Sequence, residues 1–171
     1  GGTGRELAVR AAAFGMEVIA VDPESVEVPD CVSECATMDG FSDLLARSRV
    51  VAVCAPLTPA TENLFDRQAF ASMGRDAMLI NVTRGRIVDE EALMEALEHG
   101  QIAGAGLDVT PVEPLPDGHP LWTMDNVVLT PHTAGASPVR DARAVEQLCD
   151  NLRRYRAREP LIGVIDKEKG Y

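Results

Sequence analysis

Short apolar runs alternate with helical patterns along the whole chain, and this alternation limits the possible folds more than any other feature. The apolar runs are continuous, as expected for strands that are covered on both faces of a parallel sheet. The pattern favours a doubly wound (Rossmann-type) α/β fold, with helices on both faces of one parallel sheet. We predict strands at residues 17–22, 49–55, 77–82, 103–109 and 127–130, and helices at residues 4–14, 41–47, 67–73, 89–98 and 138–157. No repeat or linker interrupts the series, so we expect one domain over residues 1–171.

The composition is that of a globular protein with its own core. A length of 171 residues is enough for one domain, and the net charge of −11 comes without a basic stripe, which argues against nucleic-acid and anionic-membrane partners. No apolar stretch is long enough to span a membrane and no signal peptide is recognisable, so we expect a cytoplasmic location. The four cysteines lack the paired spacing of a zinc site, and we expect no metal.

Polar side chains follow the last three predicted strands. Arg84 follows one strand, Asp108 and Glu113 follow the next, and His132 follows the last. Because the carboxyl ends of parallel strands meet at one edge of the sheet, we expect these side chains to gather there. An arginine, a carboxylate and a histidine can together bind a small anion and move a proton. The combination predicts an enzyme.

A glycine-rich start, Gly1-Gly2-Thr3-Gly4, leads directly into the first predicted helix, and the strand after that helix ends at Asp22. The spacing is close to that at which an acid bonds the adenosine ribose of a dinucleotide whose pyrophosphate faces the helix N-terminus. An ordinary strand end capped by Asp22 is the other reading, and this pattern alone does not separate the two.

The loop after that strand favours NAD over NADP. No lysine or arginine lies between Arg10 and Arg47, whereas Asp22, Glu24 and Glu27 crowd the strand end. A ribose 2′-phosphate would meet unpaired negative charge there, while two ribose hydroxyls would find an acceptor.

In this order and spacing, the motifs resemble those of the NAD-binding domain of the D-isomer-specific 2-hydroxyacid dehydrogenases. The matching segments are residues 1–4, Asp22, 56–61, 81–89, 107–114, 131–135 and the tail 160–166. The resemblance runs the whole length of the chain. It implies an NAD-dependent oxidoreductase that transfers a hydride between the nicotinamide and a D-2-hydroxy acid or its 2-oxo acid.

The resemblance also implies a role for each motif residue. Arg84 would bind the substrate carboxylate, His132 would act as general acid and base, and Glu113 would orient His132. Asp108 would hold the nicotinamide carboxamide, and a glutamate rather than a glutamine at position 113 favours 2-hydroxy acids over formate. The other implied cofactor contacts are Gly1, Gly2, Thr3, Gly4, Asp22, Pro56, Thr61, Val82, Ala134 and Gly135. Thr61 has a second reading as part of a proline-rich turn.

Two parts of the family pattern are missing from these 171 residues: the first fingerprint glycine with the strand before it, and the substrate lobe. We therefore expect an N-terminally truncated NAD-binding domain with a gap in its sheet, marginally stable and poorly active when expressed alone. The expected partners are a small 2-oxo or 2-hydroxy acid and, at full length, a second subunit of a homodimer. A non-enzymatic NAD(H)-binding corepressor and an inactive fragment are the alternative functions.

Overall fold

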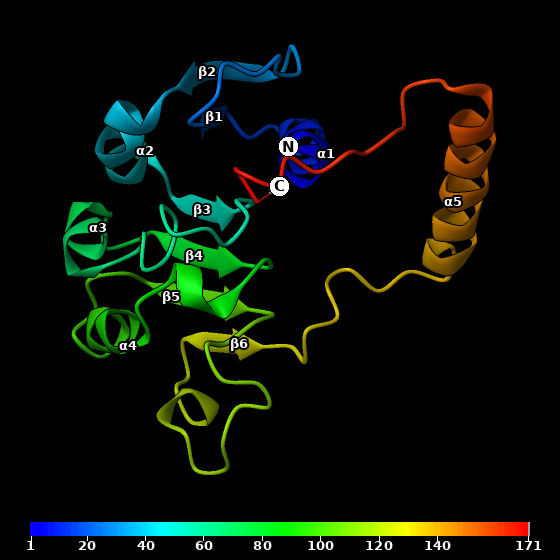
Figure 1. Ribbon diagram of the computed structural model, residues 1–171. Coiled ribbons are helices and arrows are strands. Elements are labelled where there is room, and N and C mark those ends of the chain that lie inside the picture. Colours follow the sequence, from blue (N-terminus) through cyan, green and yellow to red (C-terminus); the bar gives the residue numbers. More distant parts are fainter. Residues whose placement is uncertain (171) are drawn as a thin grey trace. The chain divides into compact units, whose positions relative to one another are not determined.

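A computed structural model describes residues 1–170 and divides them into two compact units, one from Gly1 to Pro131 and one that begins at His132. The first unit contains the strands of the described residues, and the second contains one long helix (Figure 1). Each strand runs parallel to its neighbour. The parallel α/β fold predicted from the sequence is confirmed.

The larger sheet has the order β3-β4-β5-β6. Its strands are β3 (Val50–Val53), β4 (Met78–Asn81), β5 (Gly104–Leu107) and β6 (Val127–Leu129), and the helices along the chain between β2 and β5 are α2 (Phe41–Arg47), α3 (Arg67–Ser72) and α4 (Glu90–Glu98). The four strands and three helices lie where the sequence predicts them, with ends that differ by at most two residues for most elements. Asp89 caps α4, since its side chain accepts a hydrogen bond from Ala92 N.

Helices α2, α3 and α4 lie along one side of this sheet (Figure 1). The main hydrophobic core lies between these helices and the sheet. Alternate residues of the strands point into the core, so Val51 and Leu79 are buried while Val50 and Met78 are partly exposed. Phe70 on α3 completes the packing. The core therefore holds the carboxyl ends of β4 and β5 in fixed positions.

The second sheet contains only β1 (Val18–Val21) and β2 (Val32–Ala36). Strand β2 was not predicted from the sequence, because its Val-Ser-Glu-Cys-Ala sequence has no apolar run and its central residues are exposed. Among the described residues, β1 and β3 each have one strand partner. The described strands therefore form two separate sheets.

Helix α1 (Gly2–Ala13) begins at the carboxyl ends of both sheets. The Gly1 amino nitrogen lies 3.9 Å from Asp22 Oδ2 at the end of β1. A Cβ on Gly4 would lie 3.6 Å from the Cβ of Cys54, which follows β3. The start of α1 therefore lies close to the ends of β1 and β3.

The second unit consists of α5 (Arg140–Ala157) with the segments around it. Arg158 ends the helix in the left-handed conformation. Asn151 then fixes the tail, because its side chain exchanges two hydrogen bonds with the backbone of Ile162, at 2.9 and 3.0 Å. None of the helices in residues 1–170 has the length and apolar composition that a membrane span requires.

Candidate active site

The predicted substrate arginine lies on a turn that a buried asparagine holds in place. Asn81, the last residue of β4, is 1% exposed. Its Nδ2 donates to the Arg84 carbonyl oxygen at 3.0 Å, and its Oδ1 accepts from the Thr83 backbone N–H and hydroxyl, both at 3.1 Å. Because one buried side chain satisfies three polar groups of the turn, the turn has a defined shape at the end of β4.

The Arg84 side chain is exposed. Its Nη1 donates to the Thr83 carbonyl oxygen at 2.7 Å, which directs the guanidinium along its own turn. A guanidinium is a planar fork of several N–H donors, so this contact leaves donors for a carboxylate.

Gly85 joins this turn to the loop that follows β5. A Cβ on Gly85 would lie 2.0 Å from the Thr110 carbonyl carbon and 2.3 Å from Pro111 N, closer than any real contact. Both neighbouring atoms belong to the backbone and cannot rotate away. Glycine is therefore required here, and the Arg84 turn and the Glu113 loop lie directly against each other.

The Glu113 carboxylate is fixed by a local bond within its loop. Its Oε1 accepts from Thr110 N at 3.1 Å, and the Thr110 hydroxyl donates to the Val112 carbonyl oxygen at 2.8 Å. The Glu113–Pro114 peptide bond is cis. Glu113 is exposed, so its carboxylate can reach a partner beyond the loop.

Asp108 ties the same edge to β4 and to the chain after β6. It is 5% exposed, its backbone N–H donates to the Asn81 carbonyl oxygen at 2.9 Å, and its Oδ1 accepts from the Thr130 hydroxyl. The structure thus brings the segments of Arg84, Asp108 and Glu113 to one edge of the sheet, as expected from the strand ends.

The structure describes His132 in the second unit, together with Ala134 and Gly135. His132 has a φ of 54°, which is uncommon for a residue with a side chain and shows a specific local backbone shape. The pairing of His132 with Glu113 stays a prediction from their motifs.

The predicted dinucleotide residues have an arrangement that fits a pyrophosphate and a ribose. The first turn of α1 has no side-chain cap, and a Cβ at Gly1 or Gly2 would meet nothing within 4 Å, so a ligand can approach the backbone N–H groups. Asp22 lies beside this turn, and its Oδ1 accepts from Glu24 N at 3.0 Å, which shapes the following loop. Donors for phosphate and an acceptor for hydroxyls therefore share one edge.

The proline-rich segment after β3 has a clear structural role. The Thr61 hydroxyl donates to the Pro56 carbonyl oxygen at 2.6 Å and accepts from Thr58 N at 2.8 Å. These bonds support the reading of Thr61 as a turn residue, and its contact with a cofactor stays a prediction. Val82, the remaining predicted contact in the first unit, is half-buried directly after β4.

Two polar contacts near these residues were not predicted from the sequence. Arg5 on α1 donates to the Glu27 carbonyl oxygen, so a cation reaches the acidic loop after β1 although none is near it in sequence. His119, on the chain between β5 and β6, lies with its Nε2 3.4 Å from Glu90 Oε1. Neither contact has a sequence signal, because both depend on the paths of loops.

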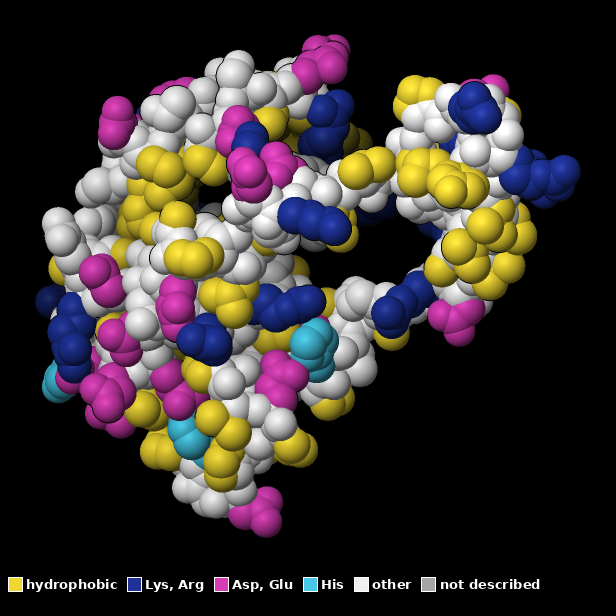
Figure 2. All heavy atoms as spheres, in the orientation of Figure 1, with side chains coloured by type: hydrophobic (Ala, Val, Ile, Leu, Met, Phe, Trp, Pro, Cys, Tyr) yellow, Lys and Arg dark blue, Asp and Glu magenta, His cyan; other side chains and the backbone are white. Residues whose placement is uncertain are grey.

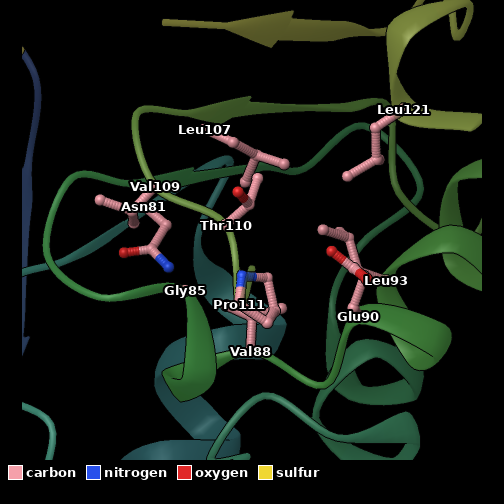
Figure 3. Close-up of a pocket in the computed structure, with 10 residues that line it drawn as sticks. All are labelled: Asn81, Gly85, Val88, Glu90, Leu93, Leu107, Val109, Thr110, Pro111 and Leu121. Carbon is pink, nitrogen blue, oxygen red and sulfur yellow. The ribbon is translucent and has the colours of Figure 1, made fainter. Parts of the chain in front are cut away.

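A cavity lies next to Gly85 of the Arg84 turn and to Thr110 and Pro111 of the Glu113 loop (Figure 3). Its lining residues are Asn81, Gly85, Val88, Glu90, Leu93, Leu107, Val109, Thr110, Pro111 and Leu121. Most of these side chains are apolar, and Glu90 brings the single carboxylate of this lining. The lining therefore combines residues of α4 with residues of the Arg84 turn and of the loop after β5.

Cys54, the residue after β3, lies close to the start of α1. Burial raises the pKa of the Cys54 thiol, so this cysteine is a poor nucleophile at neutral pH. No cluster of three or more His, Cys, Asp and Glu side chains suited to a metal ion occurs in the part of the chain that the structure describes. Figure 2 shows acidic side chains spread over the visible face of the first unit, with basic side chains between them.

A sequence model of the D-isomer specific 2-hydroxyacid dehydrogenase NAD binding domain matches residues 1–134. The chain is 39% identical to a glycerate dehydrogenase from Methylorubrum extorquens over 165 residues, which are 94% of this chain and 49% of that protein. It spans about half the length of the curated relatives it matches.

The solved structures that resemble this chain are also 2-hydroxyacid dehydrogenases or reductases. A D-isomer specific 2-hydroxyacid dehydrogenase from Xanthobacter autotrophicus, in complex with NADPH and MES, is 41% identical with a TM-score of 0.89, over 96% of this chain and 66% of that one. An NADPH-dependent glyoxylate/hydroxypyruvate reductase from Sinorhizobium meliloti, in complex with NADP and sulfate, is 33% identical with a TM-score of 0.91, over 100% of this chain and 54% of that one.

Proposed function

Because the chain belongs to the D-isomer-specific 2-hydroxyacid dehydrogenase family, we propose that it acts as an NAD-dependent oxidoreductase on a small D-2-hydroxy acid and its 2-oxo acid. The observation that carries the proposal is the contact of Gly85 with Thr110 and Pro111, which places the Arg84 turn against the Glu113 loop. An anion-binding group and a carboxylate then share the edge of the sheet at which ligands of doubly wound folds bind.

Arg84 binds the carboxylate of the substrate. Its guanidinium is exposed and is carried by a turn whose polar groups Asn81 satisfies. A planar fork of donors suits a carboxylate and also polarises the neighbouring carbonyl group. A bound nicotinamide supplies or accepts the hydride at substrate C2.

His132 gives a proton to the carbonyl oxygen in reduction and takes it back in oxidation. A histidine serves both directions because its ordinary pKa lies near neutral pH. Glu113 orients the His132 ring. This assignment of the two residues rests on their motifs.

The acidic loop after β1 supports NAD as the cofactor. Asp22 lies at the strand end beside α1, where its carboxylate can accept from the ribose hydroxyls. The two solved relatives were crystallised with NADPH or NADP, so the selectivity needs its own test. Arg5 is the cation closest to this loop in the described bonds, and it donates to a backbone carbonyl oxygen there.

The names of the relatives, a glycerate dehydrogenase and a glyoxylate/hydroxypyruvate reductase, suggest glyoxylate and hydroxypyruvate as first substrates to test. Pyruvate and phosphohydroxypyruvate complete a panel that varies the group on C2. We also propose a cytoplasmic location and, as the family resemblance implies, a homodimer. Light scattering of the purified protein can check the dimer.

The experiment is a calorimetric titration with NADH and NADPH, followed by the oxo-acid panel with the preferred cofactor. We expect NADH to bind more tightly than NADPH and at least one 2-oxo acid to be reduced. Binding of NADH without turnover of any 2-oxo acid would favour the non-enzymatic alternative. Absence of binding to both cofactors would refute the proposal.

A further inference from the structure

The structure shows a histidine–carboxylate pair, His119 and Glu90, that has no part in the reaction above. His119 precedes a short 3₁₀ helix, η3 (Pro120–Trp122), and Glu90 is the first residue of α4. The Nε2 of His119 is 3.4 Å from Oε1 of Glu90, and the two side chains are 16% and 25% exposed. Because both side chains are mostly covered, water screens the attraction between them less than that of an ion pair on the open surface. The contact therefore stabilises the fold more than an exposed pair would.

The other ring nitrogen of His119 is also engaged. Its Nδ1 accepts from Leu121 N at 3.4 Å, and Leu121 is buried in the core. With Nδ1 as the acceptor, the proton of the neutral ring is on Nε2 and faces Glu90. The contact with Glu90 is therefore attractive in the neutral and in the protonated form of His119.

The Glu90 carboxylate lies partly covered beside the predicted site. Its Oε2 is buried and has no hydrogen-bond partner among the described residues, while its carboxylate lines the cavity with Asn81, Gly85 and Thr110 (Figure 3). A carboxylate in such a place depends on its counter-group, because loss of one member of a covered pair leaves an uncompensated charge. His119 is the counter-group that the structure provides.

The pair fastens the far end of the loop that carries Glu113. At the near end, Thr110 and Pro111 pack on Gly85. At the far end, Leu121 enters the core and His119 meets α4. Glu113 lies between the two anchors, and its Oε1 is bound to the backbone of the near one.

We propose that Glu90 and His119 are positioning residues for Glu113, a role that rests on the function proposed above for that carboxylate. Their contact keeps the loop from residue 109 to residue 121 closed against α4. The Glu113 carboxylate then stays at the edge of the sheet where Arg84 lies. Small displacements of a catalytic group are costly in rate, so an anchor outside the reaction can still control turnover.

Two variants break the contact from opposite sides, Glu90→Ala and His119→Asn. Asparagine keeps an acceptor near Nδ1 for Leu121 N but is too short to reach Glu90. Glu91→Ala is the matched control, because it removes an exposed carboxylate from the same first turn of α4 without touching His119. Glu90→Gln keeps an acceptor for the Nε2–H.

Hydrogen exchange of the Thr110 amide, followed by NMR, reports on the loop directly, since this N–H donates to Glu113. We expect about tenfold faster exchange in both breaking variants, wild-type exchange in Glu91→Ala, and most of the protection restored in Glu90→Gln. Unchanged exchange in Glu90→Ala and His119→Asn, or the same increase in the control, would overturn the proposal.

Turnover of a 2-oxo acid with NADH then tests the link to Glu113. We expect kcat to fall about tenfold in the two breaking variants, with the KM for NADH unchanged. Faster exchange with unchanged kcat would overturn the positioning role. If the wild-type protein reduces none of the 2-oxo acids, the proposed function fails, while the exchange comparison still decides whether the pair fastens the loop.

Discussion

The two sheets of the first unit differ in how completely they are packed. The four-stranded sheet is covered by α2, α3 and α4 on one side, and its strands supply much of the main hydrophobic core. The strands β1 and β2 supply no residue to that core among the described residues, and their side chains are half-buried or exposed. Arg84, which is proposed to bind the substrate, follows a strand of the four-stranded sheet. Asp22, which is proposed to select the cofactor, follows a strand of the two-stranded sheet.

From this difference we expect the two sheets to have different roles, one in positioning catalytic groups and the other in cofactor recognition. A group that must be held accurately for chemistry is best carried by a well-packed element. An acid that accepts from ribose hydroxyls needs mainly the right charge and access, which a less buried strand end can supply. Mutations in the two sheets should therefore separate stability from cofactor choice.

The largest difference is expected for apolar truncations in the two sheets. Leu79→Ala in β4 removes a side chain that is 0% exposed and should cost about 3 kcal/mol of the free energy of unfolding. Ile19→Ala in β1, where the side chain is half-buried, should cost roughly 1 kcal/mol. Urea unfolding of both variants measures the contrast. Equal losses would mean that the two sheets are equally important for the fold.

Two glycine substitutions sharpen the contrast. Gly85→Ala forces a Cβ into the backbone of Thr110 and Pro111 and should cost about 2 kcal/mol. Gly2→Ala meets nothing within 4 Å in α1 and should leave stability unchanged or raise it by up to about 1 kcal/mol. The same unfolding assay applies. A harmless Gly85→Ala would contradict the close contact between the Arg84 turn and the Glu113 loop.

Polar substitutions should separate the roles of the two edges. Asn81→Ala leaves the polar groups of the Arg84 turn without their buried partner and should cost about 1–3 kcal/mol. Asp22→Ala should leave stability nearly unchanged but weaken NADH binding by about tenfold, with a smaller effect on NADPH. Calorimetry and urea unfolding of each variant check both effects. An Asp22 variant that loses both cofactors equally would contradict the selectivity assignment.

The smallest effect concerns the exposed ion pair between α3 and α4. Arg67 donates two hydrogen bonds to Glu95, at 2.6 and 2.8 Å, and these bonds hold the pKa of the Glu95 carboxyl below its ordinary value. A carboxyl with a lowered folded-state pKa stabilises the fold above its unfolded-state pKa. This contribution is lost as the pH falls through the folded-state value.

The free energy of unfolding of the wild type should accordingly fall slightly more between pH 7 and pH 3 than that of Glu95→Gln. Salt should shrink the difference, because both side chains are exposed. Parallel pH curves for the two proteins at low salt would show that the pair adds nothing.

The strands with a continuous apolar run and the helices with a clear apolar face could be predicted from the sequence. Strands such as 77–82 and helices such as 89–98 were predicted to within a few residues, because burial and helix caps leave local patterns. Strand β2 escaped because a short edge strand with exposed polar residues has no such pattern. The gathering of Arg84 and Glu113 at one edge was predictable from the topology of a parallel sheet.

Contacts between a helix and a distant loop could not be predicted from the sequence. The contact between Glu90 and His119, and that between Arg5 and Glu27, join segments far apart in the chain. Their residues have ordinary local explanations, such as an acid in the first turn of a helix. Only the folded path of the loops shows that they meet.

The most direct test of the proposed site compares cofactor binding with turnover in Arg84→Ala and His132→Ala. We predict that both variants bind NADH as the wild type does, while kcat/KM for the best 2-oxo acid falls by about two orders of magnitude or more. Near wild-type turnover in both variants would contradict the assignment of this edge of the sheet as the substrate site.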